Sequence, residues 1–172
     1  MMKQPLTSYC TILILALILV WGCVKPPDYP EEPVINYIGA NKNQVFQGSV
    51  GAPQDTLSVT FGFTDGDADL GDPENVNVFF YDSRNELLDP IPIKLNAIPD
   101  QGTGNGISGE ITVKIPNILA GGNICCIFPD GRVCQVDPEF PVDSFFYYIE
   151  IMDRAGHISN RIRTETITIL CD

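Results

Sequence analysis

An acidic loop occupies residues 64–73, and its side chains are of a type that binds metal ions. The loop holds the aspartates Asp65, Asp67, Asp69 and Asp72. Carboxylates this close repel one another unless a cation neutralises them, and Ca²⁺ takes about six to eight oxygens from carboxylates, carbonyls and water. The spacing therefore predicts a calcium site. The alternative is a solvated acidic turn, because Asp and Gly also favour turns without a metal.

The acidic loop is not an EF-hand. Counted from Asp65, the sixth position is Leu70 where glycine is required, and the twelfth is Val76 rather than glutamate. The run resembles instead the Asp-x-Asp-x-Asp-Leu-Gly segment of Bacteroidota lipoproteins that carry sandwich domains. That resemblance implies calcium as the bound ion.

A second chemical feature is a set of four cysteines in the C-terminal part of the chain: Cys125, Cys126, Cys134 and Cys171. Export through an oxidising envelope would make two disulfides the default. A bond between the adjacent Cys125 and Cys126 is strained, which leaves two pairings. Either of these two bonds Cys134, and the other bonds Cys171. A zinc site is the rival interpretation, but the spacing lacks Cys-x-x-Cys.

Residues 1–22 have the character of a signal peptide. Lys3 provides a positive start and residues 11–20 form an apolar run. This run is shorter than the roughly 20 apolar residues that span a bilayer, which disfavours an uncleaved anchor helix.

The sequence Val20-Trp21-Gly22-Cys23 resembles the lipobox of bacterial lipoproteins, although Trp21 is bulky for its position. The resemblance implies that Cys23 is acylated and anchors the chain in a membrane by its N-terminal lipid. Residues 23–33 then form a proline-rich tether, which would be extended over about 30 Å. The acids Asp28, Glu31 and Glu32 resemble the export signals of Bacteroidota surface lipoproteins, which implies the outer membrane and exposure at the cell surface.

From residue 34 to residue 172 the apolar residues alternate with a period of two, and no convincing helical pattern interrupts them. Seven strands are predicted: Val34–Ala40, Leu57–Phe63, Val76–Phe80, Ile91–Leu95, Ile111–Ile115, Phe145–Ile151 and Arg161–Leu170. Alternation indicates sheets with one buried face. The predicted fold is therefore an all-β, immunoglobulin-like antiparallel β-sandwich in a single domain.

The segment Tyr147–Asn160, YYIEIMDRAGHISN, resembles the last hairpin of immunoglobulin-like and fibronectin type III-like bacterial modules. In that topology the loops after the second and sixth predicted strands lie at one end. Asp153 would then face the acidic loop as a distant ligand, unless it only initiates a turn. The connection 116–143 and Cys171 would lie at the opposite end.

The net charge of −12 makes nucleic acid an improbable partner, because phosphate contacts need clustered cations. The single histidine, His157, is expected in a turn, and an enzyme is not expected. We first expect a non-catalytic binding or adhesion module for a glycan or an envelope protein. The alternative is a structural accessory subunit of an envelope complex with a calcium-stiffened loop. The aromatic residues Phe79, Tyr81, Phe146 and Tyr148 could stack sugars or simply cover a sheet.

Overall fold

A computed structural model of the chain describes residues 28–48, 53–85, 89–99, 106–118 and 124–171. The predicted signal peptide, Cys23 and the first part of the tether lie outside these residues. Within the described ranges there is no helix with the length and apolar character needed to cross a membrane.

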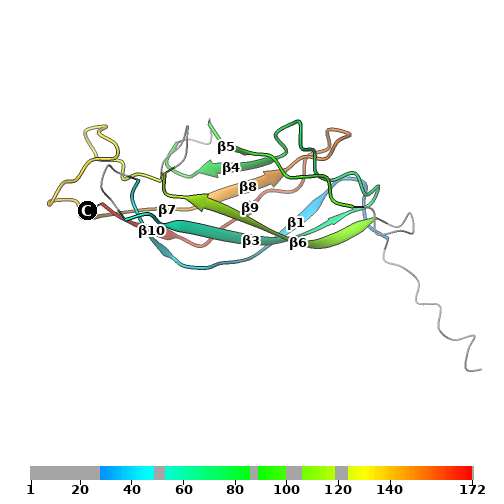
Figure 1. Ribbon diagram of the computed structural model, residues 1–172, viewed down its shortest axis with the longest axis horizontal. Helices are drawn as coiled ribbons and strands as arrows, with labels where there is room; N and C mark the ends of the chain where they lie inside the picture. The colour runs from blue at the N-terminus through cyan, green and yellow to red at the C-terminus, as the bar shows by residue number, and fades with distance from the viewer. Residues whose placement is uncertain (1–27, 49–52, 86–88, 100–105, 119–123, 172) are drawn as a thin grey trace, which may run out of the picture.

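The described residues form strands and no helix (Figure 1). The strands are β1 (Val34–Ala40), β2 (Gln44–Phe46), β3 (Thr56–Asp65), β4 (Val78–Asp82), β5 (Ile91–Ile93), β6 (Ile107–Pro116), β7 (Val142–Phe145), β8 (Tyr147–Ile151), β9 (Ile162–Arg163) and β10 (Ile167–Leu170). Their order is β1-β3-β6 in one sheet, β5-β4-β8-β9 in a second, and β2-β10-β7 in a third.

The sheet β1-β3-β6 is built on β3, which pairs with β6 along ten residues without a register shift. On β3 the side chains of Leu57, Val59 and Phe61 are completely buried, as the alternating pattern requires. They meet Phe80 of β4 and Ile149 of β8, which are also completely buried. The burial of these two apolar faces supplies the main favourable term in folding.

Two segments of the chain each contribute one strand to the second sheet and one to the third. Only Phe146 separates β7 from β8, and residues 164–166 separate β9 from β10. At this break the hydroxyl oxygen of Thr164 accepts a hydrogen bond from the Tyr147 N–H at 2.9 Å. A side-chain hydrogen bond thus replaces part of the ladder, and the pairing register moves by one residue between the two halves.

The predicted all-β sandwich is confirmed, although the strands are more numerous than expected. The sixth and seventh predicted strands are each broken into two, and β2 was not predicted because three residues carry too little pattern. The neighbours β1-β3-β6 and β4-β8-β9 correspond to the A-B-E and C-F-G neighbours of an immunoglobulin-like sandwich.

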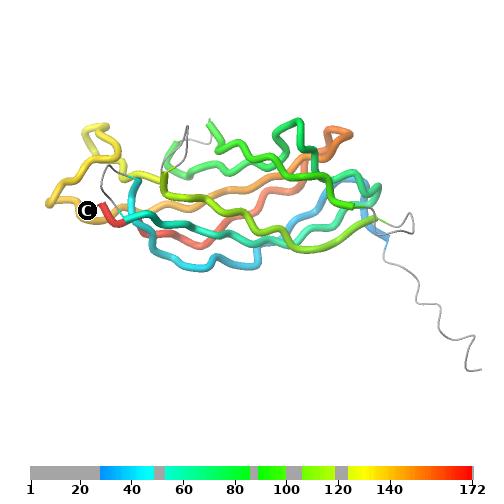
Figure 2. Tube along the Cα trace, in the orientation of Figure 1, coloured from blue at the N-terminus to red at the C-terminus, as the bar shows by residue number. Residues whose placement is uncertain are grey.

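The two ends of the sandwich differ in what holds them. Disulfides Cys125–Cys134 and Cys126–Cys171 lie at one end, which is one of the two pairings that the sequence left open. The fully buried Gln47 donates hydrogen bonds from its side chain to the backbone oxygens of Cys171 and Gln135. The start of the described chain lies at the other end (Figure 2).

Removal of either disulfide should destabilise the domain, and the longer covalent loop should contribute more. Loop-closure entropy gives about 4 kcal/mol for the Cys126–Cys171 bond, which spans 45 residues, and about 2.6 kcal/mol for the Cys125–Cys134 bond, which spans 9. Paired Cys→Ala variants of each bond, compared by chemical denaturation, test this order. A larger loss from the Cys125–Cys134 pair would contradict it.

Candidate metal centre

Asp65 is the last residue of β3 and its side chain is withdrawn from water. The residue is completely buried. Its Oδ2 accepts hydrogen bonds from the Asp69 N–H at 2.9 Å and the Leu70 N–H at 3.2 Å, which fold the loop back over the strand end. Its Oδ1 has no hydrogen-bond partner within the described chain. A buried carboxylate oxygen without a partner is unfavourable unless a cation or a proton meets it.

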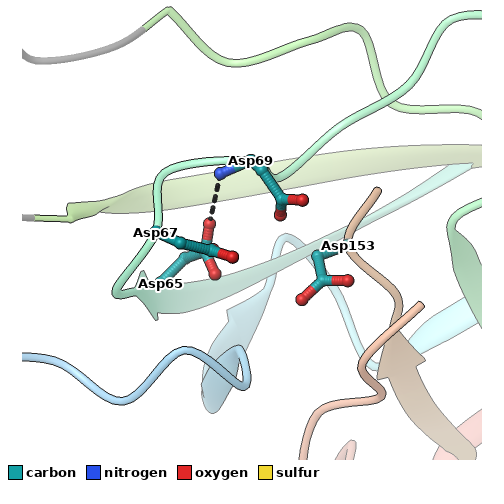
Figure 3. Close-up of side chains that lie close together, drawn as sticks. All are labelled: Asp65, Asp67, Asp69 and Asp153. Carbon is teal, nitrogen blue, oxygen red and sulfur yellow. Dashed lines mark hydrogen bonds between the residues drawn. The ribbon is translucent and has the colours of Figure 1, made fainter. Parts of the chain in front are cut away.

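The backbone of the loop turns sharply between the aspartates. Ala68 has a φ of 61°, in the left-handed region that residues other than glycine seldom adopt. This turn lets Asp67 and Asp69 reach the same region as Asp65 (Figure 3). The loop is thus held in a conformation that gathers like charges, which a folded chain tolerates only with compensation.

Asp153 reaches this region from the turn that follows β8. The backbones of Leu70 and Asp153 form an isolated antiparallel bridge, and Asp153 is only 4% exposed. Its carboxylate accepts a hydrogen bond from the His157 N–H at 2.8 Å and contacts the His157 ring nitrogen Nδ1 at 2.9 Å. These two contacts with the histidine fix the orientation of the carboxylate.

The four carboxylates form one cluster, with one oxygen each from Asp65, Asp67, Asp69 and Asp153 within 4.8 Å of one another. Figure 3 shows Asp65, Asp67 and Asp69 together on the acidic loop and Asp153 approaching from a separate segment. This all-oxygen arrangement could hold a metal ion. The sequence-predicted meeting of Asp153 with the acidic loop is present in the structure.

The electrostatics of the cluster favour neutralisation. Burial, together with the charge of Asp67, raises the pKa of Asp65 to about 6. Burial, followed by repulsion from Asp153, also raises the pKa of Asp69. The hydrogen bond to Asp153 raises the pKa of His157. Each shift has the sign expected for a site that holds too much negative charge.

Asp72, which the sequence grouped with these ligands, does not join the cluster. Its carboxylate accepts hydrogen bonds from the N–H of Glu74 at 2.8 Å and of Asn75 at 3.3 Å, and from the Asn75 side chain at 2.8 Å. These hydrogen bonds lower its pKa. Asp72 instead stabilises the turn that follows the acidic loop, because the donors of Glu74 and Asn75 engage both of its carboxylate oxygens.

The tether contacts the acidic loop, which the sequence analysis did not predict. A Cβ atom at Gly66 would lie 2.5 Å from the backbone oxygens of both Tyr29 and Pro30, so only glycine fits there. The chain therefore enters the domain directly beside the metal candidate. No periodicity in the sequence signals this contact, since it depends on where a proline-rich segment turns.

Three of the four aromatic residues that could stack sugars, Tyr81, Phe146 and Tyr148, have arginine guanidinium groups over their rings. The guanidinium of Arg161 lies 5.2 Å from the ring centre of Tyr81 and 5.7 Å from that of Tyr148. The guanidinium of Arg163 lies 3.8 Å from the ring centre of Phe146. These cation–π contacts occupy ring surface that a stacked sugar would need.

Comparisons with protein-family models, with curated proteins and with solved structures found no match to this chain.

Replacement of Asp65 by Asn should stabilise the cation-free protein at pH 7, although it removes a candidate ligand. A rise of the Asp65 pKa from 3.8 to about 6 corresponds to about 3 kcal/mol of unfavourable free energy in the charged state. The asparagine oxygen can still accept the hydrogen bonds from Asp69 and Leu70.

The pH dependence of protein stability shows whether the charged Asp65 side chain opposes folding. Because the folded-state pKa of Asp65 is raised, its contribution lowers stability as the pH rises from about 4 to about 6.5. Chemical denaturation in EDTA at pH 4.5 and pH 7 should show this decrease in the parent and a smaller decrease in Asp65→Asn. A variant that is less stable than the parent at pH 7 would contradict the assignment.

Proposed function

We propose that this chain is a lipid-anchored envelope protein whose non-catalytic β-sandwich is stiffened by Ca²⁺ at its anchor end. The ligands would be Asp65, Asp67, Asp69 and Asp153. The observation that carries the proposal is the fully buried Asp65 with an oxygen that has no partner in the described chain. The role we favour is that of a structural accessory subunit in an envelope complex.

A bound cation would compensate the cluster and connect two loops. Four carboxylates come from two turns that are about 90 residues apart in the sequence, and their repulsion opposes the closed arrangement. A divalent ion replaces this repulsion with attraction between the ion and each carboxylate. Cation binding would therefore stabilise the folded state by a free energy that grows with the logarithm of the free ion concentration once that concentration exceeds Kd.

Calcium fits the donor set better than other common ions. Ca²⁺ accepts several carboxylates in irregular geometry and completes its shell with carbonyls and water. Mg²⁺ demands octahedral geometry and keeps several waters, whereas Zn²⁺ prefers nitrogen and sulfur donors. The candidate site offers carboxylate oxygens only, and its histidine is engaged with Asp153.

The location in the envelope is supported by three features of the chain. The first is the likeness of residues 20–23 to a lipobox. The second is the presence of two disulfides, which form and persist in oxidising compartments. The third is the position of Tyr29 and Pro30 at the end that carries the acidic loop. Together they favour a domain tethered to a membrane of the envelope, with its disulfide-bonded end directed away from that membrane. The acids Asp28, Glu31 and Glu32 favour the outer membrane.

The covered aromatic rings favour the structural role over binding or adhesion. A glycan that stacked on Tyr81, Tyr148 or Phe146 would first have to displace an arginine side chain. A glycan array probed with the mature protein checks this preference. Specific binding that is lost in Tyr148→Ala would replace the structural role with a binding role.

Calcium should raise the melting temperature of the mature protein, and EDTA should reverse the effect. At an ion concentration of about 100 times Kd the gain is about 2.7 kcal/mol, or about 5–10 °C for a domain of this size. Asp67→Ala should abolish the shift and leave the cation-free protein at least as stable as the parent, because Asp67 is exposed and its charge raises the pKa of Asp65. Asp72→Asn is the matched control, which should keep the calcium response. A shift that survives Asp67→Ala would refute the assigned ligands.

Cys23 should carry the lipid. Metabolic labelling with palmitate should mark the full chain, and Cys23→Ser should remove both the label and the membrane association. Cys10→Ser is the control, because Cys10 lies in the predicted leader. Labelling that persists in Cys23→Ser would contradict the proposed anchor.

A further inference from the structure

The strand β6 forms an open edge of the sandwich. It pairs with β3 on one side, and no other described strand pairs with it on the other side. Between residues 109 and 115, no backbone hydrogen bond within the described chain leads to a segment other than β3. In an antiparallel strand, alternate N–H and C=O groups then point outward and can pair with another strand.

Apart from the charges of Glu110 and Lys114, this edge lacks the features by which proteins commonly protect exposed strands. It is long, and its register with β3 has no bulge. Proline occurs only at its last position, Pro116. Its charged residues, Glu110 and Lys114, are exposed on the outer face, whereas Ile111 and Val113 face the core. Along residues 109–115 only these two charges oppose a partner strand, and they do so only where the partner places like charges opposite them.

The two charged residues on the outer face of β6 have opposite signs and lie at equal distances along the strand from Thr112. Glu110 lies two residues before Thr112, and Lys114 lies two residues after it. If a second copy pairs antiparallel with Thr112 opposite its own equivalent, each Glu110 lies opposite a Lys114. Opposite charges directly across a sheet stabilise the pair, and like charges destabilise it.

The same pattern selects this register over its neighbours. A slip that centres the pairing on Glu110 or on Lys114 places identical charges opposite each other. Pairing of odd-numbered with even-numbered residues would place buried side chains of one copy opposite exposed side chains of the other. Pairing centred on Ile111 or Val113 keeps the alternation but loses both Glu110–Lys114 pairs. Pairing centred on Thr112 therefore satisfies both the charges and the alternation, and it uses nearly the whole strand.

The surface beside the edge is apolar. Next to Gly109 a shallow groove is lined by Phe63, Leu95, Ile98 and Ile111. In the register centred on Thr112, Ile111 of one copy lies opposite Val113 of the other at the rim of the core. These two residues retain 6% and 7% exposure, which a neighbouring strand would cover.

We propose that two copies of this chain associate through β6 as a two-fold symmetric dimer. The two copies then share one continuous sheet in the order β1-β3-β6-β6-β3-β1. The contact is isologous, with the same residues on both sides, so it closes at two copies and does not propagate. This proposal is independent of the cation and of the lipid.

Cross-linking of the full chain in cell envelopes tests the pairing. Thr112→Cys should give a dimer with a short bifunctional maleimide, because the two side chains are neighbours about 5 Å apart across the strands. Thr60→Cys is the matched control. Thr60 lies beside Thr112 on the same face, with their hydroxyl oxygens 2.8 Å apart, but two Thr60 positions would be about 14 Å apart. A cross-linker shorter than two strand spacings, about 10 Å, should therefore join two Thr112→Cys chains but not two Thr60→Cys chains.

A charge exchange then tests the register. In the Thr112→Cys background, Glu110→Lys should weaken dimerisation at least about tenfold, because two attractive pairs become repulsive. The double variant Glu110→Lys with Lys114→Glu should restore it. Thermal melts of each variant verify that the fold is retained.

The outcomes are decisive in either direction. A Thr112→Cys dimer that exceeds both Thr60→Cys and the unsubstituted chain, and that responds to the charge exchange, supports the proposal. Equal yields from Thr112→Cys and Thr60→Cys would overturn the dimer. Failure of the double variant to recover the yield would overturn the register.

Discussion

A carboxylate withdrawn from water at the end of the central strand determines the structure of one end of this domain. Asp65 continues the ladder of β3 with its backbone while its side chain holds the N–H groups of Asp69 and Leu70. The acidic loop is folded around that single residue. Because the carboxylate is buried among others of its kind, the geometry that closes the loop also creates the need for positive charge.

The opposite end is closed by disulfides and by neutral side-chain amides. Two disulfides connect residues 125–134 and the C-terminus, and the buried amide of Gln47 satisfies backbone groups that the strands leave open. Asn117, also buried, donates to the backbone oxygens of Gln47 and Pro53. One end is thus closed by disulfides, which depend on oxidation. The closure of the other end depends on the charge of the four clustered aspartates.

The sequence was most informative where burial on one face imposes a period of two. It predicted β3 nearly in full and the second half of β6, because Leu57 to Phe63 and Ile111 to Ile115 each line the core. The first half of β6 was missed, because Gly109 interrupts the apolar pattern after Ile107. Topology then brought Asp153 to the acidic loop. The break between β9 and β10 was not predictable, because it depends on a hydrogen bond from Tyr147 to the Thr164 hydroxyl that leaves no trace in the apolar pattern. Asp72 was grouped with the ligands because spacing alone cannot show that Asn75 satisfies it.

The position of the chain entry has a mechanical consequence. For a protein tethered at its amino end, a load on residues 28–33 passes into the domain through β1, which runs antiparallel to β3. The hydrogen bonds of that pair lie across the direction of the load, so they are sheared together rather than opened one after another. At the far end the Cys126–Cys171 bond prevents the last strand from peeling away. The arrangement of strands and crosslink thus resists extension along the axis that leads from the tether to the tip.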